Sequence, residues 1–233
     1  MAETFRALTS ESGCGWYSLA SMTPLSYLRR TPLYDAYLMV SNRKGLRDRK
    51  AEVAFYRQFI KRDSLVFDAG ANAGHKTDIF LRCGGRVIAI EPGKDSLKTL
   101  RQRFGGHPKV TIVPVAISDR QGTATFYQCT NSAYSSCSES WVRSLQDVGR
   151  PEGKFTFAGA REVPTQTLDS MIAEYGQPEF IKLDVEGYEL QALKGLSHAV
   201  PSVSIEVNFP NDRENAIESI KRISGLGTGR RAD

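Results

Sequence analysis

The stretch FDAGANAGHKT (residues 67–77) combines an acidic residue, two glycines and a lysine–threonine pair directly after an apolar run. Glycines in a turn that follows a buried strand let the backbone approach a bound ligand closely. Three kinds of ligand are compatible with such a turn: the phosphates of a nucleotide, a dinucleotide, or another ligand that contains adenosine. The spacing of the residues in and after the turn distinguishes between them.

A phosphate-binding P-loop requires the pattern G-x-x-x-x-G-K-[ST], and Gly70, Lys76 and Thr77 match it. His75 takes the place of the second glycine, where a ring obstructs the backbone amides that would face the phosphates. A dinucleotide-binding turn requires G-x-G-x-x-G, and Asn72 and His75 replace its second and third glycines. The dinucleotide is therefore disfavoured, and a P-loop-like nucleotide-phosphate enzyme remains only as an alternative.

The turn also contains the pattern D-x-G-x-N-x-G, formed by Asp68, Gly70, Asn72 and Gly74. Asp68 would close the first strand, Gly70 would permit the sharp turn, and Gly74 would let the next helix begin close to a ligand carboxylate. Glu91 ends the next apolar run about twenty residues later, where a carboxylate can accept both hydroxyls of a ribose. S-adenosylmethionine, an adenosine joined to a zwitterionic amino acid, meets both requirements.

The apolar runs predict an α/β fold with a mostly parallel, twisted sheet and helices on both of its faces. Helices that end at glycine pairs are expected at 75–85 and 94–106, as in βαβ units, and an amphipathic helix at 46–62 precedes the first strand. Residues 130–159 are expected to form a long surface loop. The predicted strands are 64–70, 86–92, 110–118, 180–187 and 202–208, with further strands at 122–129 and at the start of 160–176.

Composition limits the functional classes. The net charge is +5, but Lys and Arg are spread along the chain, which argues against nucleic-acid binding. The four cysteines lack CxxC spacing, so they indicate neither a zinc site nor a disulfide framework. No run reaches the length of a membrane span, and the first residues do not resemble a signal peptide, so a cytoplasmic protein is expected. We expect one domain at 46–233 after an N-terminal appendage at 1–45.

The segment IKLDVEGYELQALKGL (residues 181–196) resembles the FkbM-type family of S-adenosylmethionine-dependent methyltransferases, most of which are O-methyltransferases. The resemblance extends over roughly residues 64–210 and implies a Rossmann-like class I methyltransferase fold. Asp184 and Glu186 match its D-V-E-G motif, which lies beside the donor methyl in this fold. The resemblance assigns to the methyl donor the turn residues and the acid named above: Asp68, Gly70, Asn72, Gly74 and Glu91.

Asp184 and Glu186 are the predicted catalytic residues. Two positions apart on an extended segment, their side chains would point the same way at the carboxyl end of the sheet. Such paired carboxylates either raise one pKa, which gives a general base, or share a divalent cation that acidifies the acceptor hydroxyl. The alternative for Glu186 is that it binds backbone amides at the start of the next helix. His75 is predicted to contact the donor carboxylate, or else to be a solvated histidine.

The stretch SAYSSCSESW (residues 132–141) is similar to a pattern in a subset of the family that includes enzymes that 2-O-methylate the fucose of rhizobial Nod factors. Tyr134 and Trp141 are predicted to stack on a sugar ring, although Trp141 could instead seal the loop to the core. Glu206 and Asn208 are predicted to hold an acceptor hydroxyl, with ordinary strand-end hydrogen bonding as the alternative.

The predicted acceptor is a hydroxyl of a glycan, for which fucose is one candidate, or of a small metabolite. A nucleic-acid methyltransferase and a member that binds the donor without catalysis remain as alternatives. The fold normally ends in an antiparallel hairpin at one edge of the sheet. A helix is expected at 212–224, but the residues after it are too few and too rich in glycine for two strands, so this hairpin is expected to be missing.

Overall fold

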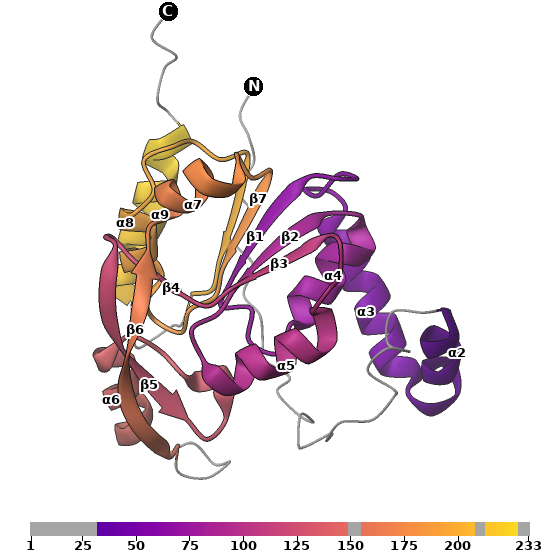
Figure 1. Cartoon of the computed structure of the whole chain (residues 1–233), viewed down its shortest axis with the longest axis horizontal. Helices are drawn as coiled ribbons and strands as arrows, with labels where there is room; N and C mark the ends of the chain where they lie inside the picture. Colours follow the sequence, from indigo (N-terminus) through magenta and orange to yellow (C-terminus); the bar gives the residue numbers. More distant parts are fainter. Residues whose placement is uncertain (1–31, 149–154, 208–212, 228–233) are drawn as a thin grey trace, which may run out of the picture.

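The computed structural model describes residues 32–148, 155–207 and 213–227. Its centre is a five-stranded parallel sheet with the strand order β3-β2-β1-β7-β8 (Figure 1). The chain runs outward from β1 to β3 and then crosses to the other side of β1, so the direction of winding reverses between β1 and β7. Ligands of such sheets bind outside the carboxyl ends of the strands at this switch point. The strands are β1 (Leu65–Ala69), β2 (Arg86–Ile90), β3 (Val110–Val113), β7 (Phe180–Leu183) and β8 (Ser202–Ile205).

Helices cover both faces of the sheet (Figure 1). On one face, Val66 and Phe180 pack with Phe80 of the first helix after β1. On the other face, Phe67 and Ile181 belong to a core that continues into the later helices. One face carries α3 (Arg43–Tyr56), α4 (His75–Cys83) and α5 (Lys94–Phe104), and the other carries α7 (Leu168–Tyr175), α8 (Glu189–Lys194) and α9 (Arg213–Gly227). The predicted Rossmann-like α/β fold is therefore confirmed.

The helix before β1 begins and ends earlier than the predicted range 46–62. The side chain of Asn42 accepts a hydrogen bond from the backbone nitrogen of Gly45 at 2.8 Å, which caps the start of α3. A further helix, α2 (Pro32–Ser41), precedes it. The boundary at residue 45 falls inside α3, and the division into an appendage and a domain stays a prediction.

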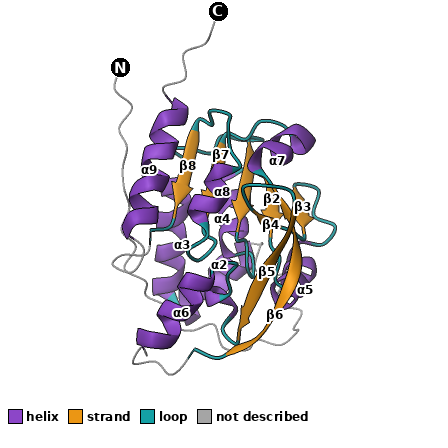
Figure 2. Cartoon of the chain, turned by 90° about the vertical axis from the view of Figure 1, so that its left-hand side faces the viewer, coloured by secondary structure: helices purple, strands orange, loops and turns teal. Residues whose placement is uncertain are grey.

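The interval between β3 and β7 forms a second, three-stranded sheet with the order β4-β6-β5. Its strands are β4 (Ala116–Ile117), β5 (Gly122–Cys129) and β6 (Phe157–Gln166), and Figure 2 shows β5 and β6 as a long paired ribbon outside the central sheet. The predicted surface loop is wrong for much of its length, because it contains a 3₁₀ turn, η1 (Ser132–Tyr134), and a helix, α6 (Glu139–Val148). Trp141, Val142 and Leu145 give α6 a buried apolar face.

Several strand ends also differ from the prediction. The predicted strand 110–118 splits into β3 of the central sheet and β4 of the second sheet, and β2 stops at Ile90. β7 stops at Leu183 and β8 at Ile205, before the acidic residues that follow each of them. The predicted helix near the C-terminus is α9, and among the described residues no strand follows β8, whose outer edge pairs with no other strand. None of the helices that the structure describes is long and apolar enough to cross a membrane.

Gly70 makes the turn after β1 possible. Its φ is +75°, and a Cβ atom there would lie 1.8 Å from the carbonyl oxygen of Asp184. We predict that Gly70→Ala lowers the free energy of unfolding by about 2–4 kcal/mol, because positive-φ strain adds to a backbone clash. Gly106→Ala is the matched control, since its φ is +76° but a Cβ atom would meet nothing within 4 Å. Urea unfolding should show a loss of only about 1 kcal/mol for the control. Equal losses of unfolding free energy in the two variants would show that the contact between residue 70 and the backbone of Asp184 adds nothing to the strain of the positive φ.

Candidate active site

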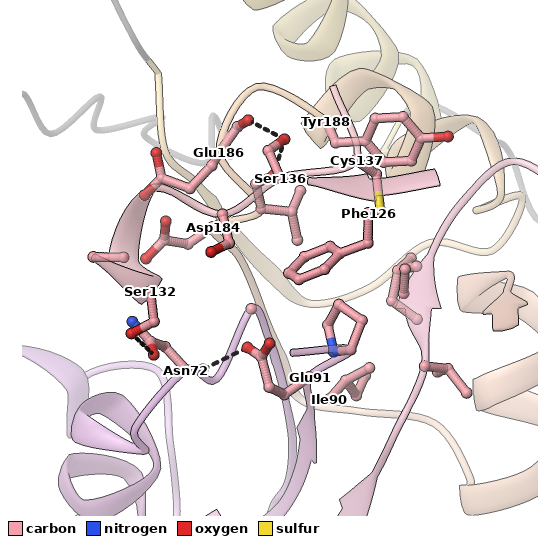
Figure 3. Close-up of a pocket in the computed structure, with 18 residues that line it drawn as sticks. Asn72, Ile90, Glu91, Phe126, Ser132, Ser136, Cys137, Asp184, Glu186 and Tyr188 are labelled. Carbon is pink, nitrogen blue, oxygen red and sulfur yellow. Dashed lines mark hydrogen bonds between the residues drawn. The ribbon is translucent and has the colours of Figure 1, made fainter. Parts of the chain in front are cut away.

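A cavity of about 130 Å³ lies at the carboxyl ends of the central strands (Figure 3). Gly70 and Asn72 from the β1–α4 turn form one part of its wall, and Glu91 at the end of β2 forms another. Asp184 and Glu186, which follow β7, complete this side. The structure therefore brings five of the predicted site residues together at the switch point of the sheet.

Glu91 is buried in the cavity wall, with 6% of its surface exposed. Its Oε2 accepts a hydrogen bond from the backbone nitrogen of Asn72 at 2.8 Å, and its Oε1 accepts one from that of Gly93 at 2.6 Å. Burial raises the pKa of Glu91 to about 7, although these two amide hydrogen bonds oppose the shift. Each carboxylate oxygen keeps a lone pair, so Glu91 can still accept hydroxyls from a ligand.

Asn72 connects the turn after β1 to two other elements. Its φ is +45°, and its Oδ1 accepts hydrogen bonds from the hydroxyls of Ser96 on α5, at 2.9 Å, and of Ser132 on η1, at 3.0 Å. Asparagine tolerates this left-handed conformation better than most residues. The side chain of Asn72 therefore fixes the shape of the cavity wall.

Two other residues of the predicted donor-binding turn lie outside the cavity wall. Asp68 is 0% exposed, and its Oδ2 accepts a hydrogen bond from the hydroxyl of Thr77 at 2.6 Å. A Cβ atom at Gly74 would lie 2.4 Å from the ring of Phe104, so this glycine permits close packing of α5. Both residues were predicted to bind the donor, but neither lines the cavity.

His75 does not line the cavity either. Its Nε2 lies 3.2 Å from Oε1 of Glu52 on α3, and the ammonium of Lys76 lies 2.6 Å from the other oxygen of the same carboxylate. Burial raises the pKa of Glu52, but the hydrogen bonds from His75 and Lys76 outweigh it and lower the pKa to about 2. The predicted contact of His75 with a donor carboxylate is therefore not supported by its placement.

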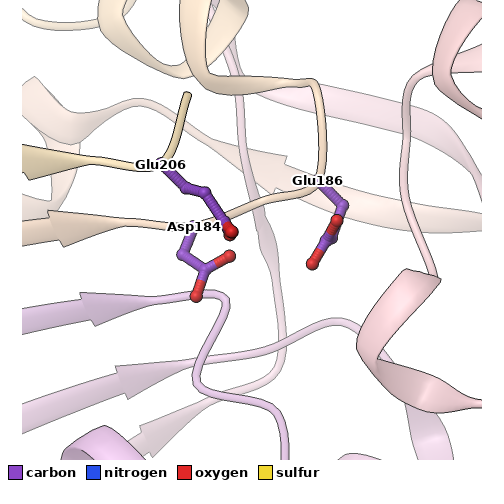
Figure 4. A group of neighbouring side chains, drawn as sticks. All are labelled: Asp184, Glu186 and Glu206. Atoms are coloured by element: carbon purple, nitrogen blue, oxygen red, sulfur yellow. The ribbon is translucent and has the colours of Figure 1, made fainter. Parts of the chain in front are cut away.

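Three carboxyl groups gather beyond the ends of β7 and β8 (Figure 4). Asp184, Glu186 and Glu206 each offer an oxygen within 4.8 Å of the others. Asp184 and Glu186 were predicted to lie on one extended segment, and this is wrong. β7 ends at Leu183, and Glu186 has a φ of +55°, so the chain has already turned. The hydroxyl of Ser136 donates to the backbone carbonyl of Glu186 at 2.6 Å, which holds this turn in place.

The three carboxyl groups differ in protonation. Burial raises the pKa of Glu186 well above its ordinary value, and a hydrogen bond with Asp184, together with burial, raises that of Glu206 to about 8. Burial acts in the same direction on Asp184, but the ammonium of Lys182 and hydrogen bonds from Glu206 and Lys182 lower its pKa. At pH 7 Asp184 is thus the ionised member of the cluster. A shared proton explains why Asp184 and Glu206 are close, so their spacing alone does not argue for a divalent cation, which was the alternative to a raised pKa.

Sequence reasoning missed two buried charged residues. The Oε1 of Glu189 accepts a hydrogen bond from the backbone nitrogen of Val185 at 2.9 Å, which is the helix-start role that had been considered for Glu186. Lys182 is buried on β7, and its ammonium lies 3.0 Å from Oδ2 of Asp184. A lysine inside the otherwise apolar run FIKL was the signal that could have identified it.

The aromatic residues predicted to stack on a sugar do not line the cavity. Trp141 is 5% exposed and packs against Gly187, in agreement with the alternative role as a seal. Tyr134 packs edge-on against Phe155, with ring centroids 4.7 Å apart. Asn208 lies outside the described residues. The cavity wall instead contains further residues of the second sheet and of the segments beside it: Phe126, Ser132, Ser136, Cys137 and Tyr188 (Figure 3).

Comparisons with known proteins show which family the chain resembles. The methyltransferase FkbM domain matches residues 68–225 of the chain. The chain is 25% identical over 168 residues to the hexuronic acid methyltransferase AglP of Haloferax volcanii, over 70% of this chain and 63% of AglP. It is 25% identical over 166 residues to the 2-O-methyltransferase NoeI of Sinorhizobium fredii, over 65% of this chain and 67% of NoeI. The chain thus spans less than two thirds of the length of AglP.

A solved structure with a distant similarity is the precorrin-6y C5,15-methyltransferase from Geobacter metallireducens GS-15. Its TM-score to this chain is 0.36 and its sequence identity is 12%, with 77% of this chain and 69% of that chain covered.

The raised pKa of Glu91 predicts a pH-dependent loss of stability. Between its ordinary pKa of 4.5 and about 7, Glu91 is ionised in the unfolded chain but protonated in the folded one. The free energy of unfolding therefore falls as the pH rises through this range. From pH 5 to pH 8 the free energy of unfolding of the wild type should fall by about 2.5 kcal/mol more than that of Glu91→Gln, because a glutamine at this position cannot titrate.

Urea unfolding at both pH values measures this difference. Glu218→Gln is the control, because Glu218 is exposed on α9 and its replacement should leave the pH dependence as in the wild type. If the free energy of unfolding of Glu91→Gln fell with pH as much as that of the wild type, the titration of Glu91 would not be the cause of the pH dependence.

Proposed function

This chain belongs to the FkbM methyltransferase family, and on that premise we propose that it transfers a methyl group from S-adenosylmethionine to a hydroxyl of a sugar or glycan. The observation that carries the proposal is the shared cavity wall of Gly70, Glu91 and Asp184. A turn, a ribose-binding acid and an ionised carboxylate, at the ends of three neighbouring strands, are the groups that this reaction needs.

The residues of the cavity are suited to an adenosine-containing donor. Glu91 offers carboxylate oxygens for a ribose diol, and the turn at Gly70 and Asn72 lies beside it. Ile90, Ile117 and Phe126 add apolar surface against which an adenine ring can pack. A buried acid surrounded by apolar groups is a costly arrangement for stability alone, which supports a role in binding.

When bound, S-adenosylmethionine supplies a methyl group on a positively charged sulfur. An oxygen nucleophile can attack the methyl carbon, and the sulfur then leaves as a neutral thioether. The contribution of Asp184 is to accept the proton that the acceptor hydroxyl loses as the new bond forms. Asp184 is ionised at pH 7, whereas the raised pKa values of Glu186 and Glu206 keep their protons in place. The negative charge of this three-carboxyl cluster therefore belongs to Asp184, and Glu206 orients it through their hydrogen bond.

The nature of the acceptor is proposed from the relatives. The names of AglP and NoeI describe methyl transfer to a hexuronic acid and to a 2-hydroxyl. The first name specifies a sugar acid and the second an oxygen acceptor, and a sugar hydroxyl is compatible with both, so a sugar acceptor is proposed here. The fucose of a lipochitooligosaccharide Nod factor is one specific acceptor of this class, and a hydroxylated small metabolite is the alternative outside it.

A P-loop-like nucleotide-phosphate enzyme is opposed by two contacts. The ammonium of Lys76, which would have to reach the phosphates, lies 2.6 Å from Glu52 on α3 and does not line the cavity. His75, which stands where the pattern requires its second glycine, lies 3.2 Å from the same carboxylate of Glu52. ATP and NAD therefore serve as negative controls in the binding test.

The binding test is a thermal-shift panel on the whole chain. We expect S-adenosylhomocysteine to stabilise the folded state by about 2.7 kcal/mol at a concentration one hundred times its Kd, and ATP–Mg²⁺ and NAD to have no effect. Glu91→Ala should remove most of the shift, since the ribose hydroxyls lose their acceptor, while Glu218→Ala on exposed α9 should keep it. Stabilisation by ATP–Mg²⁺ alone would contradict the proposed donor.

The catalytic test uses labelled S-adenosylmethionine with uronic acid and fucosylated chitooligosaccharide acceptors. Asp184→Asn should lower kcat by about 10²- to 10⁴-fold, because an amide cannot take the proton, and should leave the donor Kd within about threefold. Retained turnover in this variant would show that another group is the base. Donor binding without transfer to any acceptor would identify a member without catalytic activity, and transfer to nucleic acid alone would contradict the sugar acceptor.

A further inference from the structure

Lys182 is a buried cation in the centre of an apolar strand. It lies on β7 between Ile181 and Leu183, each 0% exposed, and 7% of its own side chain is exposed. Burying an ammonium costs several kcal/mol unless opposite charges and hydrogen bonds compensate it. An apolar residue at this position would complete the core without that cost. The lysine is therefore expected to do something that packing does not require.

Three acceptors surround the ammonium of Lys182. Its Nζ lies 3.0 Å from Oδ2 of Asp184, 3.2 Å from the backbone carbonyl oxygen of Gly70 and 3.4 Å from Oδ1 of Asp68. Asp68 is the register partner of Lys182 across the β1–β7 pair, and Asp184 follows two residues later. The ammonium thus joins the turn that forms the cavity wall to the proposed base.

Asp68 is a fully buried carboxyl group that contacts the ammonium of Lys182. Its Oδ2 is held by the hydroxyl of Thr77, and its buried Oδ1 has no hydrogen-bond partner, so the nearby ammonium of Lys182 is its compensation. Asp68 does not line the cavity. Its Oδ1 lies 3.4 Å from the ammonium of Lys182, which it helps to keep in place beside Asp184.

We propose that Lys182, anchored by Asp68, is a positioning residue that holds Asp184 ionised and fixed relative to the β1–α4 turn. The inference rests on the proposed function, in which Asp184 receives the proton of the acceptor. One oxygen of Asp184 is bound by the ammonium, and the carboxylate still borders the cavity. Lys182 itself touches neither donor nor acceptor, because it does not line the cavity.

The electrostatic surroundings of Asp184 agree with this role. Burial would lower the pKa of Lys182, but Asp184 and Asp68 raise it above its usual range, so the ammonium is kept at neutral pH. Lys76 also attracts Asp184, although its ammonium is already paired with Glu52. The titratable and charged groups that act on Asp184 from the surrounding elements are Lys182, Lys76, Glu186, Glu189 and Glu206.

Three variants of the full chain test the proposal. Lys182→Met removes the charge, Lys182→Arg keeps it, and Thr77→Val is the matched control, because it removes the other contact of Asp68 without changing Lys182. In Lys182→Met the acid limb of the kcat–pH profile should move up by about one pH unit or more, since Asp184 loses the charge that favours its ionised form.

The size of the kinetic effects separates positioning from donor binding. Lys182→Met should lower kcat about tenfold or more at pH 7 and change the donor Kd by less than about threefold. Lys182→Arg should restore most of kcat and keep the acid limb within about half a pH unit of the wild type. Thr77→Val should leave the midpoint of the limb unmoved. A wild-type profile in Lys182→Met, or an equal shift in Thr77→Val, would overturn the proposal.

A second readout does not depend on turnover. The ¹³C resonance of the Asp184 carboxyl, assigned by its loss in Asp184→Asn, should titrate about one pH unit higher in Lys182→Met than in the wild type. An unchanged midpoint overturns the inference even where methyl transfer is observed. A wild type without methyl transfer overturns the proposed function, while this titration still decides the role of Lys182.

The Lys182→Met variant leaves Asp68 as a buried carboxylate without its compensating charge, which can prevent folding. The double variant Asp68→Asn/Lys182→Met removes both charges and serves in its place. The same upward shift of Asp184 is expected there, and an Asp184 midpoint equal to that of the wild type would again overturn the proposal.

Discussion

The site depends on the close approach of two strand ends, at Gly70 after β1 and Asp184 after β7. Residue 70 must lack a side chain, since a Cβ atom at Gly70 would lie 1.8 Å from the carbonyl oxygen of Asp184. The ammonium of Lys182 joins the same two strand ends, because it binds the carbonyl of Gly70 and the carboxylate of Asp184. The cavity wall and the ionised carboxylate therefore keep one relative position, which a reaction that needs alignment requires.

The fold bears a cost for this arrangement. Burial raises the pKa values of Glu91 and Glu189 to about 7, and that of Glu206 is about 8, so each carboxyl group favours the unfolded chain once the pH exceeds its ordinary pKa. Apolar residues would avoid this loss. Marginally stable proteins retain such groups where binding or catalysis uses them. Glu189 is the exception with a structural role, since it binds the backbone at Val185.

The sequence predicted the sheet well because its strands are short apolar runs, and runs of this kind have few alternatives once glycine pairs mark the helix ends. Glu91 and Gly70 could be placed for the same reason, as both follow directly from strand ends. The helix α6 was missed because its buried face consists of Trp141, Val142 and Leu145 among serines and charged residues. Contacts between distant segments were also out of reach: nothing near His75 indicates that Glu52, on α3, would bind its ring.

The part of the chain that sequence reasoning treated as a loop proves to connect both halves of the site. Ser132 donates to the side chain of Asn72 in the β1–α4 turn, and Ser136 donates to the backbone of Glu186 beyond β7. Both serines line the cavity. Since η1 and the residues after it are bound to the proposed donor side and to the carboxyl cluster at once, a change in this segment would alter both together.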